Sequence, residues 1–136
     1  MANHQTKEWL KAAYADLRSM FYIINDDFLT HIVAFHSQQA IEKTLKAIII
    51  DNEERIPRVH KLQNLINRVE LDFTFNDETI EILDELYIDS RYPTDVGLLP
   101  YGKPTLEDAK KFYAVAEDFF NKSCNSLGIN ENEINS

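Results

Sequence analysis

The sequence of 136 residues has one cysteine (Cys124), three glycines and four prolines. A single cysteine excludes an intramolecular disulfide and a cysteine-rich zinc site, and so few glycines and prolines exclude collagen-like and low-complexity chains. No apolar stretch approaches the roughly 20 residues that span a bilayer, and the first residues (MANHQTKEW) lack the apolar core of a signal peptide. We therefore expect one protein domain in the reducing cytoplasm, with no metal, no cofactor and no membrane contact.

Basic residues are scarce overall and unevenly distributed. The chain has 14 Lys and Arg against 23 Asp and Glu, a net charge of −9, which does not favour RNA as a ligand. Residues 43–68 nevertheless hold six basic and three acidic residues, whereas residues 70–89 hold eight acidic residues and no Lys or Arg. Two interpretations stay open: two solvated helix faces of opposite sign, or a local basic surface that takes a phosphate on an acidic body.

Apolar residues recur at helical spacing through nearly the whole chain. They predict an amphipathic first helix over residues 9–24 and a second over residues 28–50. The second helix is apolar in almost every direction, so we expect it to be the buried central element. The stretch 69–75 alternates briefly, but it has no partner strand and is expected to be a helix end and connector.

Capping residues and prolines set the expected limits of the remaining helices. We expect the third helix to begin near Pro57, the fourth after Asn76 and the fifth after Thr105, with Gly128 as terminator. The prediction is an all-α fold, a five-helix up-and-down bundle with a long buried central second helix. Residues 1–127 would form the single domain, and the polar residues 128–136 a frayed tail.

One side of the expected central helix is polar. The polar residues that share this face, at i, i+3, i+7 and i+10, are His36, Gln39, Lys43 and Lys46. Polar groups on a buried helix are costly unless they are paired. They either pair with carboxylates of neighbouring helices, such as Asp16, or line a cleft that receives a phosphate or a base of a ligand.

Arg55 and His60 form an Arg-x4-His pair in front of the expected third helix. Such a pair can cleave RNA without a metal, because the histidine moves a proton near neutral pH and the arginine holds the phosphate. The alternative is a solvated arginine and a histidine that packs or caps the first turn of the helix. The pattern is common by chance, so these two residues are weak catalytic candidates.

Five sequence segments together resemble a known family. The chain is similar to the HEPN domain (higher eukaryotes and prokaryotes nucleotide-binding domain) over about residues 9–120. The segments that carry the resemblance are Trp9-x3-Ala13-x2-Asp16-Leu17, residues 35–43 (FHSQQAIEK), Pro57-x2-His60-x-Leu62, Ser90-Arg91-Tyr92-Pro93 and Thr105-x3-Ala109.

The resemblance implies a helical bundle that is usually dimeric and is often encoded beside a minimal nucleotidyltransferase, as a two-component or toxin–antitoxin pair. Some family members are metal-independent ribonucleases with an Arg-x4–6-His motif; Arg91 matches that arginine, but no histidine follows it. We therefore expect a non-catalytic or weakly catalytic protein that binds a nucleotide, pairs with a minimal nucleotidyltransferase, or does both. The alternatives are an endoribonuclease that cleaves RNA as a toxin, and a structural dimerisation module.

The resemblance and the chemistry of the side chains together indicate a ligand site. Lys43 and Arg91 would meet a phosphate, and Tyr92 would stack on a base. In the competing interpretation Lys43 pairs with Asp16, and Arg91 caps a helix C-terminus. A homodimer is also expected, since aromatic residues are plentiful for one small bundle. The full set of expected ligand-binding residues is His36, Gln39, Lys43, His60, Arg91 and Tyr92.

Overall fold

The computed structural model describes residues 3–52, 54–90 and 103–135, and of residues 87–90 only the course of the helix. Within these residues the chain forms helices and no strand, which confirms the all-α class. The count differs from the expected five, because six α-helices and one 3-10 helix are present. In chain order they are α1 (His4–Ile23), the 3-10 helix η1 (Asp27–Leu29), α2 (Thr30–Asp51), α3 (Leu62–Ile66), α4 (Asp77–Ser90), α5 (Leu106–Leu127) and α6 (Glu131–Asn135).

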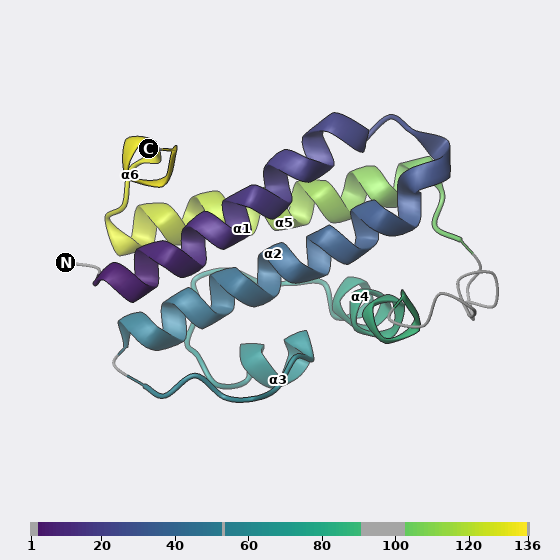
Figure 1. The fold of residues 1–136 in the computed structure, drawn as a ribbon. Helices are drawn as coiled ribbons and strands as arrows, with labels where there is room; N and C mark the ends of the chain where they lie inside the picture. Colours follow the sequence, from purple (N-terminus) through teal and green to yellow (C-terminus); the bar gives the residue numbers. More distant parts are fainter. Residues whose placement is uncertain (1–2, 53, 91–102, 136) are drawn as a thin grey trace.

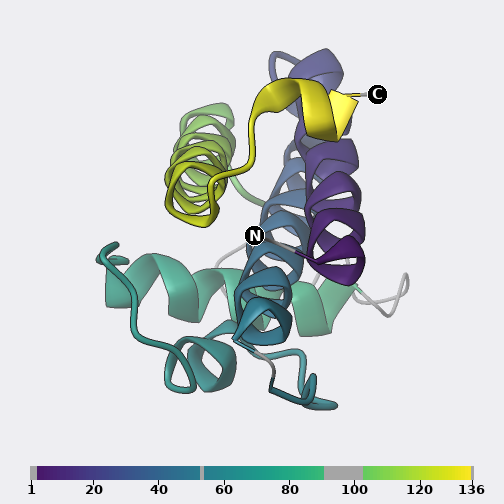
Figure 2. The same ribbon diagram turned by 90° about the vertical axis from the view of Figure 1, so that its left-hand side faces the viewer.

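Three long helices form the body of the fold. α1, α2 and α5 lie side by side, whereas α4 lies across one side of this group, as Figures 1 and 2 show from two directions. The arrangement therefore departs from the expected five-helix up-and-down bundle. α2 contacts α1, α3, α4 and α5. Thirteen of its 22 residues are buried, as expected for a central second helix.

The core is formed where these helices meet α2. Apolar side chains from every long helix fill this core. Removing such side chains from water is the main favourable contribution to folding. The largest fully buried apolar residues are Leu10, Met20, Val33, Ile41, Leu45, Ile49, Leu62, Leu65, Ile80, Leu83 and Phe119.

Helix ends that depend on neighbouring residues form as the sequence predicts. Thr105 Oγ1 accepts a hydrogen bond from the Asp108 amide at 3.0 Å, and Asp108 accepts one from the Thr105 amide at 3.1 Å, so the capping box of α5 is complete. Asn76 accepts a hydrogen bond from the Thr79 amide at the start of α4. Gly128 ends α5 with a φ of 71°, a left-handed conformation that glycine adopts without strain.

The expected start of the third helix is wrong by several residues. Residues 54–61, including Pro57, have no regular secondary structure, and α3 begins only at Leu62. The reason is Asp84 on α4, whose carboxylate accepts hydrogen bonds from the amides of Leu62 at 2.8 Å and Gln63 at 3.3 Å. Asp84 thus caps α3 from another helix, because the residue at the cap position, Lys61, provides no side-chain cap.

The segment expected to fray contains α6. Ile129 and Ile134 are buried, α6 contacts α1, and Lys7 and Glu133 lie 3.9 Å apart. These two isoleucines attach the C-terminal segment to the bundle. No helix in the described part of the chain is long and apolar enough to cross a membrane.

Replacing Asp84 by alanine removes the acceptor for the buried Leu62 amide. We predict that the free energy of unfolding falls by about 1–3 kcal/mol, the cost of an unsatisfied buried donor. Asp118→Ala, which removes an exposed carboxylate paired with Lys122, should change it by about 0.5 kcal/mol or less. Chemical unfolding followed by circular dichroism measures both variants, and equal losses would contradict the capping role.

The same carboxyl group makes stability depend on pH. Burial is the largest influence and raises the pKa of Asp84 above its usual 3.8, although the two amide hydrogen bonds lower it. The folded chain therefore binds this proton more tightly than the unfolded chain, so the group's contribution to stability declines as the pH rises from 3.8 through the folded-state pKa. Asp84→Asn does not titrate and should remove that part of the pH dependence; an unchanged profile would contradict this.

Candidate functional site

Two groups of polar contacts lie along one side of α2, and together we call them the α2 seam. The seam joins side chains of α2 to a carboxylate of α1 and to a histidine of the segment before α3. Its members are Asp16, His36, Gln38, Gln39, Glu42, Lys43, Lys46 and His60.

Asp16 of α1 forms the first end of the seam. Its Oδ1 lies 2.7 Å from His36 Nδ1, and its Oδ2 accepts a hydrogen bond from Lys43 Nζ at 2.8 Å. The Asp16 side chain is 9% exposed, whereas those of His36 and Lys43 are each 26% exposed. The pairing of Lys43 with Asp16, one of the two alternatives that the sequence left open, is thus present in the structure.

Glu42 forms the second end. Its Oε2 accepts a hydrogen bond from Lys46 Nζ at 2.9 Å and lies 3.2 Å from His60 Nδ1. Gln38 Nε2 donates to Glu42 Oε1 at 3.1 Å and to the carbonyl oxygen of His60 at 2.9 Å, which holds the segment before α3 against α2. Gln39 Nε2 donates to Gln38 Oε1 at 2.7 Å and so belongs to the Glu42 end.

The two ends repeat one electrostatic pattern, a carboxylate that holds one lysine and one histidine. Lys46 and Glu42 are almost fully buried, with side chains 7% and 6% exposed. A buried charge of this kind is tolerated only when it is paired and hydrogen-bonded. Each end is neutral in sum when its histidine is neutral, and protonation of that histidine leaves one positive charge.

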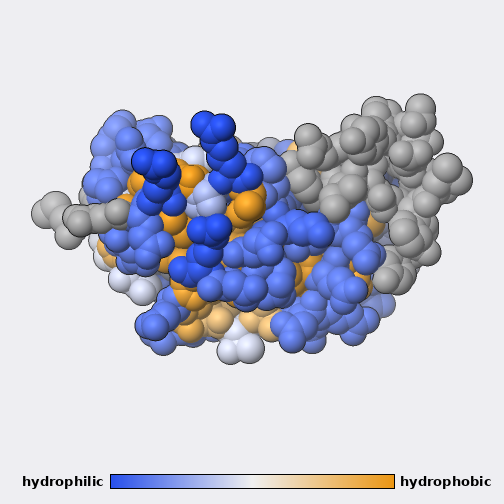
Figure 3. All heavy atoms as spheres, turned by 90° about the horizontal axis from the view of Figure 1, so that it is seen from below, coloured by the Kyte–Doolittle hydropathy of each residue, from blue (hydrophilic) through white to orange (hydrophobic). Residues whose placement is uncertain are grey.

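The seam reaches solvent at His60, whose side chain is 54% exposed although its ring contacts the buried Glu42. Arg55, Arg58 and Lys61 of the same segment are exposed as well. Figure 3 views the molecule from the side of α3, where strongly hydrophilic side chains stand beside partly exposed apolar atoms. The segment of residues 54–61 thus exposes three basic side chains, those of Arg55, Arg58 and Lys61, and one acidic side chain, that of Glu54.

The structure places four of the six expected ligand residues in two separate hydrogen-bonded groups on α2. His36 and Lys43 belong to the group around Asp16, whereas Gln39 and His60 belong to the group around Glu42. Arg91 and Tyr92 lie outside the described residues. Both weak catalytic candidates, Arg55 and His60, are exposed and belong to the segment between α2 and α3.

Sequence reasoning placed Lys46 on the polar side of α2 but did not single out Gln38 and Glu42. The available signal was the i, i+4 spacing of Glu42 and Lys46. Among the residues that the structure describes, no group of three or more His, Cys, Asp or Glu side chains could hold a metal ion.

The described residues thus form an all-helical domain in which a long central helix carries polar groups on one side. Residues 6–127 match the HEPN domain, so the chain belongs to the HEPN domain family. The fold is also similar to the crystal structure of TT1696 from Thermus thermophilus, with a TM-score of 0.69 and 21% sequence identity. The match covers 89% of this chain and 97% of that one, and it shows a shared fold. Among curated proteins, no sequence matches the chain significantly.

A double-mutant cycle measures the contribution of the Asp16 end. We predict a coupling free energy of about 1.5–3 kcal/mol between Asp16→Asn and Lys43→Met, because the partly buried pair forms a charge-assisted hydrogen bond. The matched control is the exposed pair Glu8 and Lys11, 3.9 Å apart, whose coupling should be about 0–1 kcal/mol. Chemical unfolding of the single and double variants supplies both values, and a coupling no larger than that of the control would contradict the prediction.

Proposed function

We propose that this HEPN-domain protein binds a nucleotide where the α2 seam reaches the surface, and that it pairs with a minimal nucleotidyltransferase without cleaving RNA itself. The observation that carries the proposal is the position of His60. Its ring contacts the buried Glu42 while more than half of its side chain faces solvent. In its doubly protonated form, an imidazole whose Nδ1 donates to a carboxylate can donate a second hydrogen bond from Nε2 to a phosphate oxygen.

The charges around His60 support an anionic ligand. Arg55, Arg58 and Lys61 are exposed on the same segment, so they create a local positive potential on a chain whose net charge is −9. A potential confined to one segment attracts a small phosphate-bearing molecule more readily than it covers a long RNA. A nucleotide is therefore the ligand that we favour.

The remaining residues of the proposed site have distinct roles. His36 and Lys43 are held by Asp16, so in our proposal they border the ligand site at the Asp16 end of the seam. In our proposal Arg91 meets the phosphate in bidentate fashion and Tyr92 stacks on the base. The pairing with a minimal nucleotidyltransferase is supported by the family to which the chain belongs.

A metal-independent endoribonuclease is the second candidate function, and the contact between Glu42 and His60 favours it. A carboxylate that orients an imidazole is the usual arrangement around a general base, and an exposed arginine such as Arg55 can hold a phosphate. A helix-end arginine followed by a histidine would strengthen this candidate, but no histidine follows Arg91.

Calorimetric titration with ATP and AMP tests the site. We predict that Arg91→Ala weakens binding by roughly 10- to 150-fold, the equivalent of one charged hydrogen bond, and leaves the melting temperature unchanged. His60→Asn should also weaken binding, whereas His4→Asn, at a side chain that is 85% exposed on α1, should not. An Arg91→Ala variant that is less stable but binds as tightly as the parent would contradict the proposed site.

An RNA cleavage assay without divalent metal separates the two candidate functions. The proposal predicts little or no cleavage, since the general acid–base group of the family motif is missing and such a group contributes roughly 10²- to 10⁴-fold in rate. Cleavage by the parent that is lost in His60→Ala and kept in His4→Ala would instead establish the ribonuclease.

A further inference from the structure

Residues 69–75 lie between α3 and α4, form no helix, and alternate in the exposure of their side chains. The apolar members are half-buried and pack against the core, whereas the polar members between them are exposed. Alternation with a period of two is the pattern of an extended strand that buries one face. The half-buried residues are Val69, Leu71, Phe73 and Phe75, and the exposed residues are Glu70, Asp72 and Thr74.

Aromatic contacts hold the buried face of this segment in place. The ring centroid of Phe119 on α5 lies 5.2 Å from that of Phe73 and 4.7 Å from that of Phe75. The Phe73 and Phe75 centroids are 4.8 Å apart, and aromatic pairs at such distances attract one another. A shift by one residue would turn both rings to solvent and bury the two carboxylates, so the register of the alternation is fixed.

The backbone of the segment lacks the neighbour that a strand requires. The N–H and C=O groups of residues 70–75 make no hydrogen bond with any residue that the structure describes. An extended stretch with unpaired backbone groups is a template for another strand, and proteins bind extended peptides at such edges. The segment therefore has the backbone of a strand that a second chain can complete.

A groove of about 620 Å³ lies beside the segment and reaches the C-terminal ends of α2 and α5. Three carboxylates line it, those of Asp51, Glu70 and Asp72, and none of them makes an ion pair or a hydrogen bond with any described residue. The C-terminal ends of the two helices add partial negative charge. The groove is therefore complementary to a ligand with positive charge.

Lys122 of α5 also lines the groove, but its charge is already engaged. Its Nζ lies 3.6 Å from Asp118 Oδ2 and 5.2 Å from the centroid of the Phe73 ring. Lys122 thus leaves the three carboxylates of the groove without a cationic partner.

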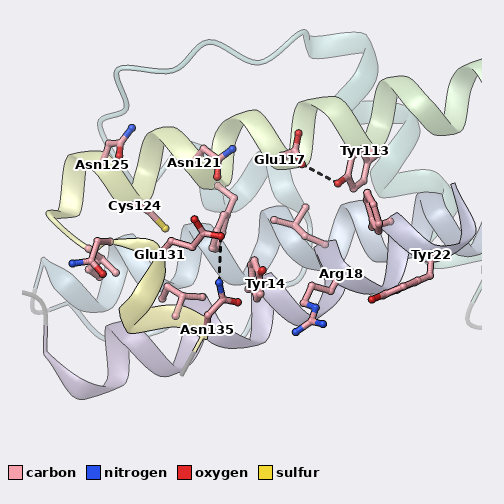
Figure 4. Close-up of a pocket in the computed structure, with 16 residues that line it drawn as sticks. Tyr14, Arg18, Tyr22, Tyr113, Glu117, Asn121, Cys124, Asn125, Glu131 and Asn135 are labelled. Atoms are coloured by element: carbon pink, nitrogen blue, oxygen red, sulfur yellow. Dashed lines mark hydrogen bonds between the residues drawn. The ribbon is translucent and has the colours of Figure 1, made fainter.

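We propose that residues 70–75 are a docking strand, which pairs by β-strand addition with an extended segment of a partner protein that carries lysine or arginine at alternate positions. The backbone of the partner satisfies the unpaired N–H and C=O groups, and its basic side chains contact Glu70 and Asp72 on the exposed face. The proposal does not depend on nucleotide binding at His60, because no residue of the α2 seam lines this groove. The groove between α1, α5 and α6 in Figure 4 is lined by other residues as well.

Fluorescence anisotropy of the full chain with a labelled synthetic peptide in which lysine alternates with valine (KVKVKVK) tests the proposal. The parent should bind this peptide and should not bind EVEVEVE. Glu70→Gln/Asp72→Asn should weaken binding by roughly 3- to 30-fold, because two exposed cross-strand ion pairs are lost. The matched control Asp27→Asn/Glu107→Gln makes the same change in net charge at exposed residues outside the groove, and it should change the affinity by about twofold or less.

Two further measurements separate strand addition from attraction between charges. Methylation of the peptide's amide nitrogens at every lysine, or at every valine, removes the hydrogen-bond donors of one edge and keeps all the charges. One of these two peptides should lose binding and the other should keep it, because an added strand pairs through one of its own edges. The infrared amide I spectrum of the complex should also contain a β-sheet band that neither the helical chain nor the free peptide shows.

Several outcomes would overturn the proposal. They are no binding of KVKVKVK, equal weakening by the two double variants, equal binding of the two methylated peptides, or a complex without a β-sheet band. Tighter binding of a helix-forming peptide of the same charge would also overturn it, because the groove would then accept a helix. Circular dichroism establishes that each variant is folded, and Glu70→Gln/Asp72→Asn removes no hydrogen bond or ion pair of the described chain.

Discussion

The structure depends on the neutralisation of charge on its central helix. α2 is buried by helices on several sides, yet it carries Glu42, Lys46, Lys43 and His36. Buried charges must be paired. Asp16 of α1 therefore lies against Lys43, and the segment before α3 lies against Gln38 of α2. The same contacts that satisfy these groups thereby fix the position of α1 and of residues 54–61 against α2.

This constraint also limits where the seam can meet a ligand. At the Asp16 end, His36 and Lys43 already contact the carboxylate, so their first role is to hold α1 on α2. At the Glu42 end, Lys46 is buried, but His60 reaches solvent beside exposed Arg58 and Lys61. A polar helix face can thus be largely structural and still provide a binding residue at one end.

Features of the fold that depend on adjacent residues could be predicted from the sequence, whereas features that depend on distant residues could not. The capping box at Thr105 and the terminator Gly128 depend on adjacent residues, and the sequence predicts both. The start of α3 depends on Asp84, which is 22 positions from Leu62. The C-terminal segment with α6 depends on the packing of Ile129 and Ile134 against the bundle. Local sequence patterns could not predict either feature. The spacing on α2 likewise found His36, Gln39 and Lys43, but only the fold shows which carboxylate each group contacts.

The central claim is that Asp16 holds His36 and Lys43 in structural contacts, whereas a ligand binds at the exposed His60. Long-range ¹H–¹⁵N spectra of the four histidine rings during a titration with ATP test it most directly. The account predicts that the ring nitrogen resonances of His60 move with nucleotide concentration, while those of His36 keep the shifts of a ring bound to Asp16. Movement of His36 without His60, or no movement of either ring at saturating nucleotide, would contradict it.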